Sequence, residues 1–277
     1  QCRPLGLDKP ALLELKRAEF ATDRPDALAL GLLACLDDPD PQIRDGIAYE
    51  AYVSLLRNDR VSSQTLGALR DRLITTLQSS IDTNGFHRPF AALVLAEVAR
   101  ADRLAPRFEE RERQQLVQAA GRYLRSIDDY RGFDDLDGWR HGVAHAADLL
   151  MQLALHPQLG RDEHLYILES IASQVAPAEH SYIYGEPQRL MRPVYFIASR
   201  ETLDAEDWAR WFDSLAEPAP LASWDDAYST NPGLSRLHNT RAFATALYPY
   251  VVPTSDEPRS EFAPLAQGVR TLLGVLP

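Results

Sequence analysis

Four side chains in the middle of the sequence have the types and spacing of a metal site. His141, His145 and Asp148 stand at i, i+4 and i+7 in a segment that we expect to be helical from about Asp137, so all three share one helix face. Two imidazoles one turn apart can share a divalent metal ion, and a carboxylate one turn further on can be its third ligand. Glu186 is a candidate fourth ligand, or the catalytic general base that activates a metal-bound water. The pattern therefore raises the hypothesis of a metal-dependent hydrolase with a divalent metal cofactor.

The same residues could instead hold neighbouring helices together. A buried charge needs a partner, and His145 with Asp148, or Arg131 with Asp128, would satisfy one another. The positions between the two histidines lack the glutamate of zinc peptidases, and Ala144 stands where an EF-hand needs its closing glutamate. We find no nucleophile motif, no phosphate-binding glycine loop and no dinucleotide fingerprint. These observations favour a structural network or a binding surface and leave open whether a reaction is catalysed.

A binding surface is the second functional hypothesis. Aromatic residues gather near the carboxylates and arginines, among them Tyr130, Tyr182 and Tyr184. Rings beside charged groups suit a sugar or a peptide, because stacking is combined with polar contacts. The expected partner is thus a small molecule, a sugar or a peptide or protein ligand. The residues that we expect to contact it are Arg88, Arg131, Trp139, Arg140, His141, His145, Asp148, Glu186 and Arg189.

The elements that position these residues are predicted to be helices. Asp40-Pro41 is a strong helix start, since aspartate suits the N-cap and proline suits the first turn. Apolar residues then recur at helical spacing in one segment after another, and we find no alternating run that would predict a strand. Beyond the first hundred residues, the predicted helices span about 109–126, 137–155, 162–175, 187–200, 204–216, 233–248 and 258–275.

A possible internal repeat groups these helices into pairs. Five segments can be aligned on one arginine near a helix start, at intervals of 44 to 52 residues: Arg44, Arg88, Arg140, Arg192 and Arg241. Each interval holds two helices and two turns, slightly longer than a HEAT-type repeat. We therefore predict an all-α, HEAT-like α-α superhelix of about five antiparallel pairs, with the five arginines lining its concave face. Residues 1–277 would form one domain, with an N-terminal cap at 1–36 and a C-terminal capping helix at 257–277.

The middle of the chain resembles a known family. The run Gly138-Trp139-Arg140-His141-Gly142-Val-Ala-His145-Ala-Ala-Asp148-Leu-Leu, with Tyr130-Arg131-Gly132 before it, is similar to the signature of the bacterial domain-of-unknown-function family 2785. Ile43-Arg44-Asp45 and Glu186-X-X-Arg189-Leu also resemble that family, across about residues 10–250. One departure is Arg88-Pro89-Phe90, where the family pattern has Arg-Ser-Phe. The resemblance implies a helical-repeat fold and supplies no activity.

Composition limits the partners and the location. A net charge of −11 argues against a nucleic-acid partner, and so against a repeat-type DNA glycosylase. No stretch is long and apolar enough for a transmembrane segment. The chain opens at Gln1 without a methionine, which fits a removed signal peptide, and Cys2 and Cys35 could form a disulfide in an exported protein. We therefore expect a periplasmic or secreted protein, with a cytoplasmic one as the alternative; the oligomeric state is not indicated.

Overall fold

The computed structural model describes residues 2–252 and 260–277, and its fold is all-α, as predicted. The α-helices are α1 (Lys9–Arg17), α2 (Pro25–Gly31), α3 (Pro41–Ile43), α4 (Glu50–Arg57), α5 (Ser63–Leu77), α6 (His87–Leu104), α7 (Glu110–Arg125), α8 (Gly142–Ala154), α9 (Arg161–Val175), α10 (Glu186–Ser199), α11 (Ala205–Ala216), α12 (Asn231–Val251) and α13 (Ala263–Val275). The π-helical turn η3 (Arg44–Tyr49) joins α3 to α4, and the short 3-10 turns are Pro4–Gly6, Leu32–Cys35, Trp224–Ser229 and Ser260–Phe262. The segment predicted at 258–275 begins at residues that lie outside the described part of the chain.

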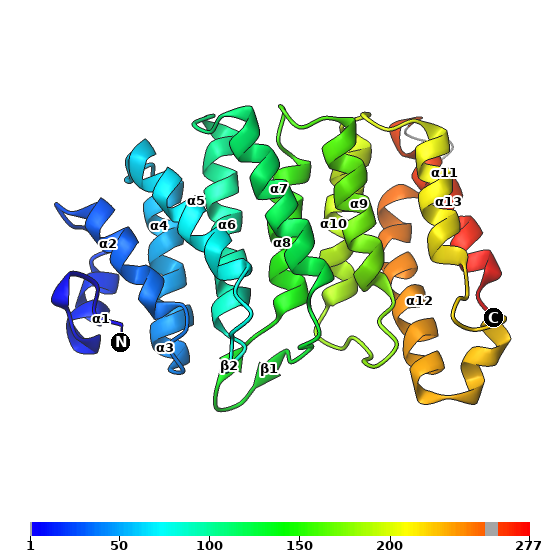
Figure 1. Cartoon of the computed structure of the whole chain (residues 1–277), viewed down its shortest axis with the longest axis horizontal. Coiled ribbons are helices and arrows are strands. Elements are labelled where there is room, and N and C mark those ends of the chain that lie inside the picture. Colours follow the sequence, from blue (N-terminus) through cyan, green and yellow to red (C-terminus); the bar gives the residue numbers. More distant parts are fainter. Residues whose placement is uncertain (1, 253–259) are drawn as a thin grey trace.

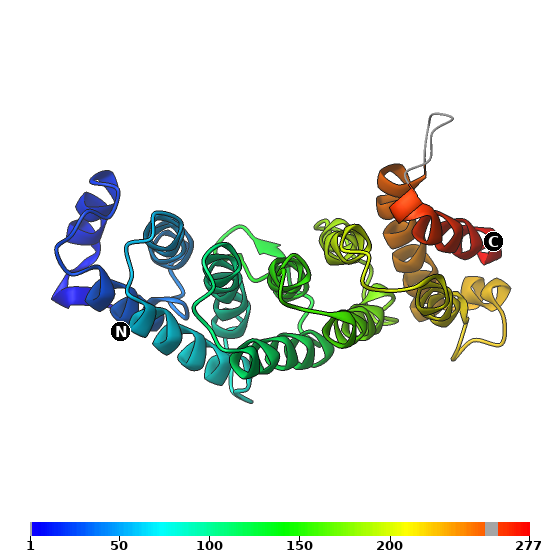
Figure 2. The same ribbon diagram turned by 90° about the horizontal axis from the view of Figure 1, so that it is seen from above.

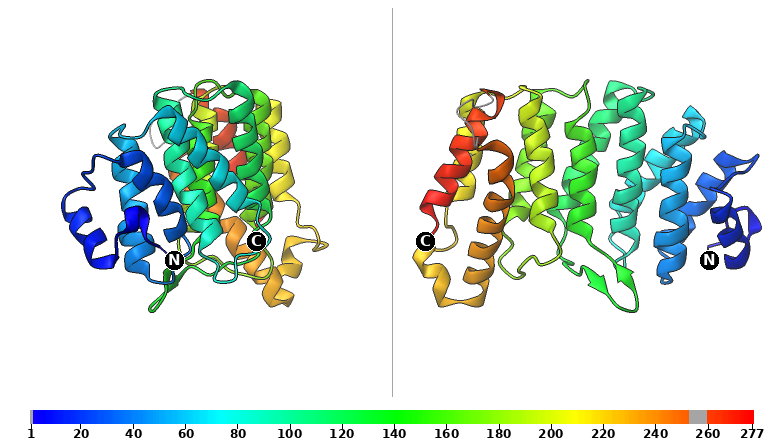
Figure 3. Two further views of the ribbon diagram at one scale, coloured as in Figure 1. Left: turned by 60° about the vertical axis from the view of Figure 1, so that its left-hand side comes forward. Right: turned by 180° about the vertical axis from the view of Figure 1, so that it is seen from behind.

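The helices form two layers that curve into an arch. Seen from above, α4, α6, α8, α10 and α12 lie along the inner side of the curve, while α5, α7, α9 and α11 form the outer layer (Figure 2). From behind, the inner helices stand side by side from blue to orange (Figure 3, right). The last helix, α13, packs against α11 and α12. Apolar side chains from both layers meet in one continuous core, because each helix has an apolar face to bury.

Local sequence signals explain where many helices begin. The carboxylates of Asp8, Asp40 and Asp204 each accept a hydrogen bond from a backbone N–H in the first turn of α1, α3 and α11. The start predicted at Asp40-Pro41 is thus confirmed, and the helical path continues through η3 into α4.

The inner helices α6, α8, α10 and α12 all begin at the same edge of the arch, the lower edge in Figure 1. The loops before them therefore gather there. One loop carries a hairpin of β1 (Phe133–Asp134) and β2 (Gly138–Trp139), with Phe133 paired to Trp139. The expectation of no strand is wrong at this point, and the helix predicted to begin at about Asp137 begins at Gly142 instead. Left-handed backbone at Gly138 and His141 interrupts the helix before that residue.

The prediction that five aligned arginines line one concave face is wrong. Arg44 is fully buried in η3, Arg140 precedes α8, and Arg192 stands in the middle of α10 rather than at its start. Arg241 lies on the exposed face of α12 and donates to the backbone oxygen of Pro277. The aligned arginines therefore do not occupy equivalent positions in successive helices. Of the predictions drawn from that alignment, the pairing of the helices remains.

The two cysteines form a disulfide. Cys2 and Cys35 are bonded and both are buried, so the first residues are fixed to the 3-10 turn that follows α2. No helix among the described residues is long and apolar enough to cross a membrane.

Candidate functional site at the start of helix α8

The hairpin before α8 is held in place by two arginines and one aromatic ring. The guanidinium carbons of Arg44 and Arg140 lie 3.9 and 4.3 Å from the centre of the Phe86 ring. Arg44 donates to the backbone oxygen of Asp137 at 2.6 Å, and Arg140 donates to the carboxylate of the same residue at 3.0 Å. Arg140 also donates to the backbone oxygen of Asn84 at 2.9 Å. Cation–π contacts and charged hydrogen bonds thus join η3, the loop before α6 and the hairpin.

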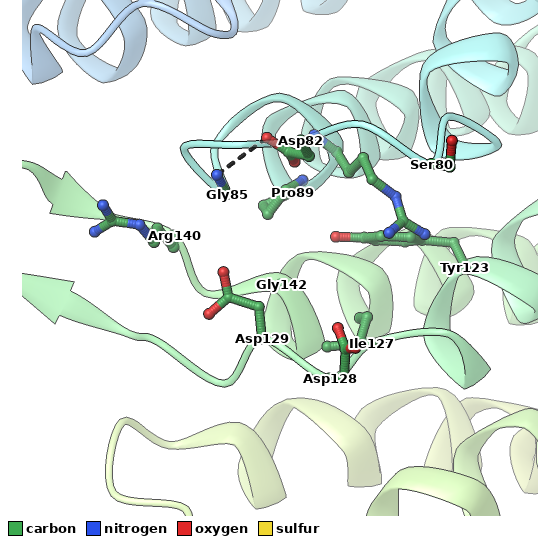
Figure 4. Close-up of a pocket in the computed structure, with 11 residues that line it drawn as sticks. Ser80, Asp82, Gly85, Pro89, Tyr123, Ile127, Asp128, Asp129, Arg140 and Gly142 are labelled. Atoms are coloured by element: carbon green, nitrogen blue, oxygen red, sulfur yellow. Dashed lines mark hydrogen bonds between the residues drawn. The ribbon is translucent and has the colours of Figure 1, made fainter.

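A cavity of about 180 Å³ opens between the starts of α6 and α8, and we call it the edge cavity (Figure 4). Its lining combines carboxylates, arginines and one phenol: Ser80, Asp82, Gly85, Arg88, Pro89, Tyr123, Ile127, Asp128, Asp129, Arg140 and Gly142. The Tyr123 hydroxyl and the Asp129 carboxylate point into it, whereas the guanidinium of Arg140 points away (Figure 4).

The phenol of the edge cavity belongs to Tyr123. The residue is only 3% exposed, and its hydroxyl makes no hydrogen bond with any residue that the structure describes. Burial raises the pKa of Tyr123, so the phenol stays neutral and can donate or accept. The Arg88 guanidinium packs over the Tyr123 ring, with its carbon 4.9 Å from the ring centre. The hydroxyl opens into the cavity, so a water molecule or a ligand group can bond to it there.

Two other polar side chains of the edge cavity, those of Asp82 and Arg88, have partners in the protein. The Asp82 carboxylate accepts backbone N–H groups of Gly85, His87 and Arg88. Arg88 donates to the backbone oxygen of Leu77 and to the Ser126 hydroxyl, both neutral acceptors. The start of α8, by contrast, has no side-chain cap, and its first residue, Gly142, lines the cavity.

His141 and Glu186 lie beside the cavity in a tight stack. The His141 ring lies 4.7 Å from Trp139 and nearly parallel to it. Its Nε2 atom is 3.7 Å from Oε1 of Glu186, too far for a hydrogen bond, and has no other partner among the described residues. Burial lowers the pKa of His141 to about 4, so the ring is neutral at pH 7. The second oxygen of Glu186 accepts the N–H of Tyr184 at 2.9 Å at the start of α10.

His145 and Asp148 lie further along α8 and are engaged elsewhere. The Nδ1 atom of His145 lies 3.2 Å from the backbone oxygen of Pro89, so Nδ1 carries the proton. Burial lowers the pKa of His145 to about 3. Asp148 is paired with Arg189; burial raises the pKa of the Asp148 carboxyl, and the Arg189 charge opposes that shift.

The four predicted metal ligands are therefore not brought together as a metal site. The rings of His141 and His145 are 5.8 Å apart, with His141 placed before the helix by its left-handed backbone. Within residues 2–252 and 260–277, no three histidine, cysteine, aspartate or glutamate side chains converge on a point that could hold a metal ion.

A second depression lies next to the edge cavity, on the other side of residues 128–131. It has a volume of about 470 Å³, and we call it the aromatic groove. Its lining comes from the hairpin loop and from the loop before α10: Asp128, Tyr130, Arg131, Gly132, Phe133, Asp134, Arg140, Glu179, His180, Ile183 and Tyr184. The Tyr130 and His180 rings stack 5.2 Å apart, and the Tyr184 ring lies against the backbone of Gly132.

The nine residues predicted to bind a ligand thus fall into four places. Arg88 and Arg140 line the edge cavity, and Arg131 lines the aromatic groove. Trp139, His141 and Glu186 form the stack between the loops, whereas His145, Asp148 and Arg189 lie among the inner helices. Sequence reasoning missed Tyr123 and Phe86, because neither belongs to a motif and each gains its role from a distant partner.

Comparison with known proteins agrees with the resemblance of the central motif. Residues 73–248, from within α5 to within α12, match the model of a family described as protein of unknown function (DUF2785). No curated protein and no solved structure matches the chain. The matched segment includes the edge cavity, the aromatic groove and the hairpin. Since it covers more than half of the sequence, the chain belongs to the DUF2785 family.

Proposed function

We propose that this chain is a binding module that holds a small polar molecule in the edge cavity. The observation that carries the proposal is the Tyr123 hydroxyl: it belongs to a residue that is only 3% exposed, points into the cavity and has no hydrogen-bond partner among the described residues. Because this hydroxyl faces the cavity and can donate or accept, a ligand group or a water molecule can bond to it there. The uncapped start of α8 lines the cavity at Gly142, and the Asp129 carboxylate, which also accepts from Arg131, points into it.

The arrangement of the helices supports a scaffold in which loops carry the site. Two layers of paired helices in an arch are what a HEAT-like repeat would form, and each inner helix contributes a loop to the same edge. Binding residues are commonly found on loops that a rigid framework positions. The Cys2–Cys35 disulfide supports a periplasmic or secreted location, because disulfides persist in oxidising compartments.

A Tyr123→Phe variant tests the proposal. The wild type is screened by thermal shift and calorimetry against monosaccharides, amino acids, small carboxylates and inorganic phosphate. We expect one class to raise Tm, and Tyr123→Phe to bind it about five- to tenfold more weakly through the loss of one hydrogen bond. The variant alone should be as stable as the wild type, since its hydroxyl bonds to no described residue. Tyr250→Phe, on an exposed tyrosine of α12, is the matched control.

Two outcomes would count against the edge cavity. One is that no compound of the panel binds. The other is that a compound binds equally well to Tyr123→Phe, which would mean that it binds elsewhere. A Gly142→Ala variant gives an independent check, because its added methyl would lie 3.2 Å from the Tyr123 oxygen and narrow the cavity.

A metal-dependent hydrolase has less support. His145 keeps an Nε2 lone pair because Nδ1 is the protonated nitrogen, which is the form that binds metals. The Asp148 carboxylate, however, is held by Arg189. Adding zinc or manganese ions to the wild type and to His145→Ala separates the two functions. One tightly bound ion that the variant loses would favour the hydrolase over the binding module.

A further inference from the structure

The aromatic groove has an excess of negative charge at its rim. Of its two arginines, Arg131 is paired with Asp129, and Arg140 is paired with Asp137 at 3.0 Å. The carboxylates of the groove itself belong to Asp128, Asp134 and Glu179; all three residues are exposed, and none forms an ion pair with a described residue. Backbone N–H groups of Leu136 and Asp137 lower the pKa of Asp134, so its carboxylate remains charged. The groove thus presents three carboxylates that have no arginine or lysine partner among the described residues.

The walls of the aromatic groove are apolar and open to solvent. Ile183 is 71% exposed and Phe133 is 46% exposed, and both line the groove. Leu136 at the tip of the hairpin is 86% exposed, which extends the apolar surface beyond the groove. Exposed large apolar side chains that adjoin one another mark interaction sites more often than isolated ones do.

We propose that the aromatic groove binds a basic peptide segment of a partner protein, in which arginine or lysine alternates with apolar residues. The rings of Tyr130, Phe133 and Tyr184 offer faces to a guanidinium or ammonium group. The carboxylates of the rim pair with the same charges, while Ile183 and Phe133 contact the apolar residues between them. A volume of about 470 Å³ is within the range of ligand sites. The net charge of −11 further attracts a cationic partner.

This surface differs from the proposed small-molecule site and does not depend on it. The two depressions share Asp128 and Arg140 in their linings, so variants that report on the groove alone must use other residues. Glu179, Asp134 and Ile183 line the groove and not the edge cavity. Asp134→Asn keeps the oxygen that accepts the Leu136 and Asp137 N–H groups, so the hairpin turn should be preserved.

The experiment uses the full chain and a short fluorescent peptide of alternating arginine and leucine, followed by anisotropy. We expect binding that weakens as salt is raised, because the contacts are between exposed charges. The double variant Asp134→Asn with Glu179→Gln should bind about fivefold more weakly, from two exposed charge contacts. Ile183→Ser should also weaken binding, with no change in its salt dependence.

A matched control separates the groove from general charge attraction. Glu110→Gln with Asp162→Asn removes the same net charge from exposed positions at the starts of α7 and α9, at the opposite edge of the arch. This control should bind the peptide as the wild type does, and so should Tyr123→Phe. An equal loss in both double variants would overturn the proposal, as would equal binding of a glutamate–leucine peptide or no binding of the arginine peptide to the wild type.

Discussion

Replacing Arg44 by methionine would test whether one buried guanidinium holds the hairpin against the rest of the fold. Arg44 is fully buried and lies over the ring of Phe86. It donates to the backbone oxygens of Asp38 at 3.0 Å and Asp137 at 2.6 Å, and lies 2.8 Å from the Asp45 carboxylate. Methionine has a similar length and can keep the apolar contacts, but it leaves these acceptors without their donor.

The expected loss of unfolding free energy is about 3 kcal/mol. Each hydrogen bond from a charged donor contributes about 1.5 kcal/mol or more, and the variant loses two to backbone oxygens. The Asp45 side chain is 30% exposed, so solvent screens its ion pair and we assign it less than about 1 kcal/mol. Loss of the cation–π contact with Phe86 is partly offset by the apolar methionine and by the removal of a buried charge.

Urea unfolding followed by circular dichroism measures this loss, with Arg72→Met at an exposed position of α5 as the control. Hydrogen exchange supplies a second measurement at Arg140 and His141, whose N–H groups donate to the loop oxygens of Gly132 and Arg131. Their exchange should accelerate in Arg44→Met and not in the control. A loss below about 1 kcal/mol, with unchanged exchange at these amides, would refute the reasoning, because it would mean that the hairpin is held without Arg44.

Three further predictions concern stability. Burial lowers the pKa of His145 to about 3, whereas in the unfolded chain this histidine binds a proton near pH 6.5. The free energy of unfolding is therefore full above about pH 6.5 and falls as the pH drops below it, by up to about 1.4 kcal/mol per pH unit. Urea unfolding at pH 7 and pH 5 should show a smaller difference for His145→Asn than for the wild type. Gly132→Ala should lower stability by about 1–3 kcal/mol, because the added methyl would come within 2.0 Å of the Tyr184 ring; unchanged unfolding and near-ultraviolet dichroism would contradict this. Reducing the Cys2–Cys35 bond, which closes a loop of 33 residues, should cost up to about 4 kcal/mol, and a Cys2→Ser variant should lose the same amount and no longer respond to the reductant.

The helices were predictable because their signals are local. A capping carboxylate, a proline in the first turn and apolar residues at helical spacing all act within a few residues of one another. The segment expected at 109–126 is α7 (Glu110–Arg125), and that expected at 204–216 is α11 (Ala205–Ala216). The disulfide was open on sequence alone, because two cysteines establish a possible bond and not the distance between them.

The hairpin and the arginine register were not predictable, since distant contacts determine both. Gly138 and His141 adopt left-handed backbone, and the carbonyl of Asp137 is bound by Arg44, which lies 93 residues away. The five arginines look equivalent in the sequence, but Arg44 is buried because its guanidinium packs over the rings of Phe86 and Phe90 in the next inner-layer segment. Their different surroundings arise from packing that no spacing in the sequence encodes.

Distant contacts also explain why the candidate site lies at the edge of the arch and not on the helix face that the sequence predicts. Helical spacing correctly predicts one face for His145 and Asp148, but α8 is packed between α6 and α10 in the inner layer. Its polar side chains there meet Pro89 and Arg189 from those neighbours and are satisfied by them. Tyr123 lies elsewhere, in the last turn of the outer helix α7, where its hydroxyl points into the edge cavity and has no hydrogen-bond partner among the described residues. In this array, polar residues in the middle of the inner helix α8 hold neighbouring helices together, whereas the site that we propose for a ligand lies at the edge where α7 ends and α8 begins.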